Sequence, residues 1–256
     1  MKRKVILPVL LLPLFQLAAQ QPDARQIMDK YRDLSITESM SAYIDLTITE
    51  KNGASRNRKI KLTTKSYPDG QEKRFIRFIE PADVRGTSML IFDHREKTDE
   101  MWIYLPALKR TRRIVSSEKG RRFMSSEFSN ADMSSPTLSD FTNRHLPNSG
   151  ENDRWIIESV LVNEDKADEY GYSRKISYID TDTYQVKKME FFNFDNELFK
   201  IIEIKSIHPL SDGKYLVKDM VAENLLNDRK SEICFSDISA GANVDDSFFT
   251  LQNLER

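Results

Sequence analysis

The sequence has few of the side chains that build metal centres and nucleophilic active sites. Its 256 residues include one cysteine, Cys234, and three histidines, His94, His145 and His208. A single thiol excludes an internal disulfide, and no pair among these four residues has the spacing of metal ligands. Nucleophile-elbow, phosphate-loop and dinucleotide-binding motifs are also missing. We therefore expect no cofactor, no metal ion and no enzymatic activity.

A basic excess is missing as well, although the charge is unevenly distributed. Lys and Arg number 39 against 40 Asp and Glu, a net charge of −1, which argues against nucleic acid as a partner. Residues 1–150 carry 26 basic and 18 acidic side chains, whereas residues 151–256 carry 13 and 22. This imbalance permits a basic face. The densest basic run lies in "YLPALKRTRRI" and contains Lys109, Arg110, Arg112 and Arg113.

Long hydrophobic runs are confined to the N-terminus. "MKRK" is followed by an apolar run from Val5 to Leu17 and then by the small residues of "AAQ". This is the pattern of a secretory signal peptide, here residues 1–19. The run is too short to cross a bilayer core of about 30 Å as a helix. We expect export of a mature chain, residues 20–256, that is not itself lipidated because no cysteine follows the cleavage region.

The mature chain has the pattern of one helix followed by many short strands. "DARQIMDKYRDL" (23–34) has apolar residues at helical spacing, and Asp23 is placed to cap the helix. From residue 42 onward, about a dozen segments alternate apolar and polar residues and are separated by turn sequences. Residues 116–150 form a polar insertion, in which the pattern indicates a short helix around Pro136–His145. The last segment, "DDSFFTLQNL", predicts a helical turn or an edge strand.

A dozen meandering strands in one sheet must curl, because strand twist accumulates. The result is a sandwich, a closed barrel, or an unclosed barrel whose concave face needs a cover. Two helical pieces on an otherwise all-β chain favour the last of these. We therefore predict a mainly β fold and a single domain over residues 20–256. Its antiparallel sheet curls into a half-open barrel, and the N-terminal helix and the helical insertion cover the apolar concave face.

Two acidic pairs are candidates for chemistry. Asp180 and Asp182 in "YIDTD" stand between two predicted strands, where Asp-Thr-Asp-Thr is typical of a turn. Glu127 and Asp132 lie in the polar insertion, where ion pairing to the arginines at 121 and 122, or capping of the following helix, accounts for them. The alternative is an exported hydrolase that uses Glu127 and Asp132, but the sequence supplies no nucleophile and base to complete it.

Several ordered segments together resemble a known family. "EPADVRGTSMLIF", "MWIYLPALKRTRRI" and "FMSSEFSNADM" are similar to the signature segments of bacterial outer-membrane lipoprotein-sorting proteins, within the LolA/LolB-like superfamily of periplasmic carriers. "YIDTDTYQVKKMEFFNFDNELFK" resembles a hairpin that recurs in that group. The chain departs from the pattern at Gln185 in place of Pro, at Asn196 in place of Gly, and at Ser125 and Glu127 in place of Gly and Asp. Asn accepts the left-handed backbone conformation of a tight turn.

The resemblance implies an unclosed antiparallel barrel with helices over an apolar cavity. It implies carriage of acylated cargo, a lipoprotein or lipid, through the periplasm toward an outer-membrane acceptor, alongside an RND-type (MMPL-like) transporter of the inner membrane. We expect the carrier to be a monomer. A second hypothesis keeps the same scaffold but makes it a sensor, which presents a lipid-occupied cavity to a regulatory partner.

Strand alternation predicts which side chains face the hollow of such a barrel. Two one-sided apolar sets are candidates for lining it, and for each residue the alternative is an ordinary contact in a packed core. The candidates are Ile44, Leu46, Ile48, Met89, Ile91, Trp102 and Tyr104 in the first half, and Trp155, Ile157 and Leu161 in the second.

Two interpretations stand for the basic patch, which is defined as Lys109, Arg110, Arg112 and Arg113. One is a docking surface for a lipid headgroup, a membrane surface or an acidic transporter domain. An attraction of about 1 kcal/mol per basic residue near anionic lipid is enough for transient docking. The other is a solvated strand-and-turn surface.

Overall fold

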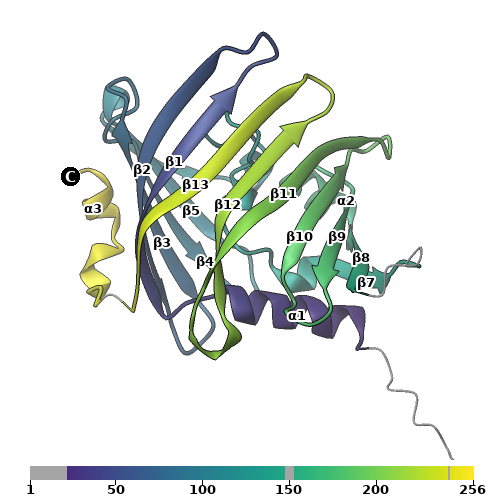
Figure 1. Ribbon diagram of the computed structural model, residues 1–256. Coiled ribbons are helices and arrows are strands. Elements are labelled where there is room, and N and C mark those ends of the chain that lie inside the picture. The colour runs from purple at the N-terminus through teal and green to yellow at the C-terminus, as the bar shows by residue number, and fades with distance from the viewer. Residues whose placement is uncertain (1–21, 148–152, 242) are drawn as a thin grey trace, which may run out of the picture.

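The main element of the computed structural model is one sheet of thirteen antiparallel strands (Figure 1). The structure describes residues 22–147, 153–241 and 243–256, so the predicted signal peptide lies outside the described residues. The strands are β1 Ser39–Thr49, β2 Ser55–Ser66, β3 Glu72–Glu80, β4 Ser88–Asp93, β5 Glu100–Leu105, β6 Arg110–Ile114, β7 Phe141–His145, β8 Arg154–Leu161, β9 Arg174–Asp180, β10 Val186–Phe192, β11 Leu198–Pro209, β12 Tyr215–Asn224 and β13 Arg229–Ala240. The predicted single antiparallel sheet is confirmed.

The sheet is two meanders joined side by side. Strands β1 to β6 and strands β7 to β13 each pair in chain order, and the antiparallel pairing of β1 with β13 joins the two halves. The free edges are β6 and β7, which follow each other in the chain. Because these two strands do not pair, the curled sheet stays open as predicted (Figure 1).

Helix α1, Ala24–Ser35, lies across one end of the sheet (Figure 1). Its start is fixed by a capping box, in which the Asp23 carboxylate accepts from the Arg25 amide at 2.8 Å and the Gln26 side chain reaches back. Ile27 and Met28 pack against an apolar cluster from strands β8 to β10. The predicted helix and its cap are confirmed.

Residues 115–140 connect the two sheet edges and contain only short 3-10 turns, at Ser116–Glu118, Phe123–Ser125, Ala131–Met133 and Leu138–Asp140. The predicted helix around Pro136–His145 is wrong. After the last 3-10 turn the chain becomes strand β7, whose Phe141 pairs with Leu161 of β8. Pairing with a strand that comes later in the chain decides this segment, and a local pattern does not contain that information.

A short helix that the sequence did not indicate, α2 Glu164–Tyr170, connects β8 to β9. Asn163 caps its start, and it ends at Gly171, which has a left-handed backbone with φ of 76°. A Cβ atom on Gly120 would lie 2.8 Å from Gly171, so the backbones of these two segments are in direct contact. The end of α2 therefore packs closely against the 115–140 segment.

Both faces of the sheet are apolar in its first half. The concave face holds the largest core cluster. On the convex face, the C-terminal segment places Phe249 and Leu254 against Phe75 and Leu90. That segment is helical, as one of the two alternatives predicted, with helix α3 at Leu251–Leu254 outside the sheet (Figure 1).

Candidate functional site

A cavity of about 230 Å³ lies on the concave face, between the strands and the helix and turns that cover them. Its volume exceeds the roughly 150 Å³ of an apolar protein cavity that binds benzene, and falls short of the roughly 300–1,000 Å³ typical of drug-sized ligands. The apolar side chains that line it include Met28, Met40, Leu62, Phe128, Leu138, Met189, Phe191, Ile202, Ile204, Leu216, Met220 and Phe235. This lining suits an apolar group.

Four of these side chains are methionines, which come from α1, β1, β10 and β12. Methionine is unbranched and adjusts its shape to irregular contents at little cost. A cavity lined in this way fits apolar groups of more than one shape.

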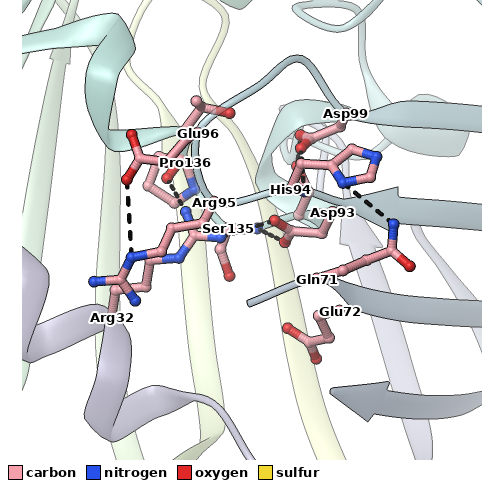
Figure 2. Close-up of polar contacts among 12 residues, drawn as sticks. Arg32, Gln71, Glu72, Asp93, His94, Arg95, Glu96, Asp99, Ser135 and Pro136 are labelled. Carbon is pink, nitrogen blue, oxygen red and sulfur yellow. Dashed lines mark hydrogen bonds and ion pairs between the residues drawn. The ribbon is translucent and has the colours of Figure 1, made fainter. Parts of the chain in front are cut away.

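A buried ion pair holds the cover to the sheet (Figure 2). Arg32 of α1 pairs with Asp93 of β4 at 3.1 Å, and the two side chains are 2% and 0% exposed. The Arg32 guanidinium also donates to the carbonyl of Pro136 at 2.6 Å, and the Ser135 amide donates to Asp93 at 2.6 Å. One carboxylate therefore binds α1 and the 115–140 segment at the same point.

Arg74 of β3 completes this buried charge cluster. Its guanidinium pairs with Glu72 at 2.8 Å and with Asp93 at 3.4 Å, and it donates to the Ser135 hydroxyl at 2.9 Å. Burial raises the pKa of Asp93, and the two arginines oppose that rise. Both arginine side chains line the cavity, so one part of its wall is strongly polar.

A second buried pairing continues the cluster toward α2. Burial raises the pKa of Asp99 to about 6, and the Asp93 charge adds to the rise. Asp99 accepts from the Ser134 hydroxyl at 2.9 Å and lies 3.7 Å from Lys119. Lys119 in turn pairs with Glu169 of α2 at 2.7 Å. The charges therefore connect α2, the turns and the sheet.

Glu127 and Asp132 are both engaged by cations. Glu127 is 4% exposed, and its carboxylate lies 3.4 Å from Arg122 and 3.1 Å from Arg229. Asp132 pairs with Lys200 at 2.8 Å, which outweighs burial and lowers the pKa of that carboxyl. Ion pairing, including the expected pair with Arg122, accounts for both carboxylates.

The turn interpretation of "YIDTD" is confirmed. The Asp180 carboxylate accepts from the amides of Asp182 and Thr183 at 3.1 and 2.8 Å. Asn196, in place of the family's Gly, has a left-handed backbone with φ of 61°. Ser125, also in place of a Gly, has a φ of 67°.

None of the ten predicted lining residues is among the side chains that line this cavity. Six of them, Ile44, Leu46, Ile48, Met89, Ile91 and Leu161, belong to the packed concave core beside it. Trp155 and Ile157 belong to the cluster under α1. These eight residues pack in apolar clusters beside the cavity, which occupies only the part of the concave face where the cover leaves space.

Trp102 and Tyr104 were assigned to the wrong face of the sheet. They pack in the convex cluster with Phe75, Leu90 and Phe249, whereas Met101 and Ile103 face the concave core. Strand β5 has apolar residues on both faces, because the C-terminal segment covers the convex side. Alternation alone does not distinguish the two faces of such a strand.

The basic patch is divided between the two faces of edge strand β6. Arg113 lies on the convex side, 6.0 Å from the ring centre of Trp102, and 3.9 Å from Glu100. Arg112 pairs with Glu118 at 2.6 Å. Lys109 and Arg110 are exposed and form no side-chain pair within the described part of the chain. The three arginines of the basic patch therefore do not all lie on one face of β6.

The described residues contain no helix that is long and apolar enough to cross a membrane. Nor do they contain a group of three or more His, Cys, Asp or Glu side chains placed to hold a metal ion.

Comparisons with known proteins agree with this architecture. A family model described as "Uncharacterized protein"-like matches residues 70–256. A crystal structure from Vibrio parahaemolyticus, of a domain assigned to outer membrane lipoprotein sorting, is 24% identical with a TM-score of 0.83, covering 91% of this chain and 98% of that one. A DUF1329 family protein from Desulfovibrio piger is 24% identical with a TM-score of 0.82, covering 90% and 97%. A LolA superfamily protein from Nitrosomonas europaea is 16% identical with a TM-score of 0.71, covering 91% and 100%. No curated protein matches the chain.

Proposed function

The chain belongs to the family whose model matches residues 70–256 and has the fold of LolA superfamily proteins, and on that premise we propose that it carries acyl chains of a lipid or lipoprotein. The observation that supports the proposal most directly is the cavity between the concave face and its cover, whose lining is largely apolar. We further propose that it works in the periplasm, for which the signal-peptide pattern of residues 1–19 is the support. We also propose that it moves cargo toward the outer membrane, as the likeness to the Vibrio parahaemolyticus lipoprotein-sorting domain suggests.

The physical reason for such a carrier is the cost of exposing an acyl chain to water. At about 0.8 kcal/mol per CH₂, a sixteen-carbon chain costs on the order of 12 kcal/mol. A cavity lined by methionine, leucine, isoleucine and phenylalanine replaces that water. Release then requires an acceptor that binds more tightly or moves the cover.

The basic patch contributes to docking, in this proposal, through its two unpaired members. Lys109 and Arg110 lie at and after the β5–β6 turn, next to Leu108, whose side chain is 68% exposed. A cation beside an exposed apolar side chain suits an anionic membrane surface. An inner-membrane RND-type transporter as donor stays a hypothesis on the resemblance alone.

Binding is tested with a fluorescent fatty acid and a variant that fills the cavity. Met189→Trp places a bulky ring among the lining residues, and we expect at least about a tenfold loss of affinity. Leu226→Trp, at an exposed turn, is the matched control and should bind normally. Equal binding by both variants, with circular dichroism unchanged, would show that the cavity does not hold the probe.

Transfer separates a carrier from a sensor. Loaded protein is mixed with anionic acceptor vesicles at physiological salt, and loss of the probe from the protein is followed in time. A carrier releases its cargo to the vesicles, and Lys109→Gln with Arg110→Gln slows that release. Retention of the probe would favour the sensor hypothesis, and an unchanged rate would leave Lys109 and Arg110 as ordinary surface.

A further inference from the structure

The cavity contains buried polar groups that no described residue satisfies. Lys175 and Ser177 lie two residues apart on β9 and line the cavity together. They are 5% and 0% exposed. The Ser177 hydroxyl has no hydrogen-bond partner within the described residues, and the Lys175 ammonium faces the Phe141 ring rather than a carboxylate. Buried polar groups normally have a partner, because an unpaired one has lost its hydrogen bonds to water without replacement.

Strand register places these two groups between an ion pair and an apolar surface. Phe191 of β10 pairs with Lys175 on one side and with Lys200 of β11 on the other. In the neighbouring row, Met189 pairs with Ser177 and with Ile202. Across the sheet, Phe191 therefore lies between two lysines, and Met189 lies between the Ser177 hydroxyl and the apolar Ile202.

The charges in this region do not balance. Asp132 is the acid near both lysines, and it is bound to Lys200 at 2.8 Å and to the Ser129 amide at 2.7 Å. The second lysine, Lys175, is left facing the Phe141 ring, with its Nζ 4.8 Å from the ring centre. Two cations and one anion leave one positive charge, which a single negative charge would neutralise.

We propose that Lys175 and Ser177 bind the carboxylate of a single-chain fatty acid whose hydrocarbon tail lies along Met189 and Ile202. The Lys175 ammonium donates to one carboxylate oxygen and the Ser177 hydroxyl donates to the other. A monoanion matches the one unpaired charge, whereas a doubly charged phosphate would exceed it. The assignment rests on the proposed function, since it names the class of cargo for the same cavity.

The test compares a fatty acid with an alcohol of the same chain length, and adds acetate as an anion without a long chain. Delipidated protein is titrated at pH 7 with dodecanoate, with dodecan-1-ol and with acetate, by calorimetry. We expect the wild type to bind dodecanoate about tenfold or more tighter than dodecan-1-ol, since hydrogen bonds to charged groups are worth about 1.5–3 kcal/mol. Lys175→Met should remove that preference, so that dodecanoate and dodecan-1-ol bind with similar affinity. Lys187→Met, at an exposed lysine of β10, is the matched control and should keep the preference.

The outcomes separate this inference from the function on which it rests. If neither amphiphile binds, the carrier function fails. If both bind equally to the wild type, the carrier function stands and the headgroup subsite is wrong. Acetate binding as tightly as dodecanoate would indicate a site for a free small anion and would also overturn the assignment. Ser177→Ala is the second variant in case Lys175→Met does not fold, and it should weaken dodecanoate alone by several-fold.

Discussion

At the scale of single residues, Lys175 is a group that ligand binding explains better than folding does. Burial is the main cause that lowers the pKa of Lys175 from 10.5 to about 8; the Asp132 charge opposes the shift and the Lys200 charge adds to it. The folded state therefore disfavours the charged form. A group of this kind reduces stability at neutral pH, and a reduced stability is acceptable where the group has a partner in the loaded protein.

The stability cost of Lys175 has a defined pH dependence. Because the folded pKa lies below the unfolded one, the cost is fully present below about pH 8 and disappears as the pH rises toward 10.5. Lys175→Met should raise the free energy of unfolding at pH 7 by about 1–3 kcal/mol, with a smaller gain at pH 9.5. Urea unfolding at both pH values measures this. An equal gain at both pH values, or a loss, would contradict a charge penalty, and Lys187→Met should change neither.

The residues that the sequence identified and those it missed differ in a physical way. Asp23, Asp180 and Asn196 act on their own backbone neighbourhood, so local patterns predicted them. Lys175 and Ser177 acquire their role from a cover that is distant in sequence. The sequence did contain one signal, a lysine at an inward-facing position of a predicted strand, because lysine is rarely buried.

At the scale of elements, α1 is the part of the cover that we expect to move. It contributes Met28, Tyr31 and Arg32 to the cavity wall. Side chains attach it to the rest of the fold, through an apolar cluster, the Arg32–Asp93 pair, hydrogen bonds to the 115–140 segment and surface pairs with Arg95. A strand is also held by a ladder of backbone hydrogen bonds, so we expect α1 to open at a lower free energy than the sheet beneath it.

Removing the buried partner of Asp93 should loosen α1 specifically. Arg32→Met leaves that carboxylate with Arg74 alone, and we expect a loss of about 3 kcal/mol of stability. Hydrogen exchange of the α1 amides should accelerate, while amides of β1 and β2 remain protected. Lys30→Met is the control, because Lys30 is an exposed residue of α1 and its replacement should change the stability by under about 1 kcal/mol. Equal protection of α1 in both variants would show that the ion pair does not hold the cover.

Sequence patterns predicted the elements better than their partners. Alternation identified the strands, but the segment from Pro136 to His145 becomes β7 only because β8 is available to pair with it. For β5, the C-terminal segment covers the outer face, so that face has apolar residues where a solvent-exposed face would have polar ones. Both errors arise where a contact between segments distant in the chain determines the structure.

At the scale of the whole molecule, the cavity is smaller than the cargo proposed for it. If the cover adjusts, affinity for saturated fatty acids should increase about fourfold per added methylene from eight to sixteen carbons, following about 0.8 kcal/mol per CH₂. Calorimetry with the series measures this. An affinity that stops rising near ten carbons would mean that the cavity is rigid, and Met189→Trp should level off at a shorter chain than the wild type.

The open sheet gives the molecule a seam. Expanding a closed barrel means breaking a complete ladder of backbone hydrogen bonds, whereas β6 and β7 have no ladder between them to break. Residues 115–140 connect β6 to β7 with short turns and side-chain contacts, so we expect that these two edge strands can move apart. The width of the cavity can then change without any loss of strand pairing, so that one protein accommodates acyl chains of different length.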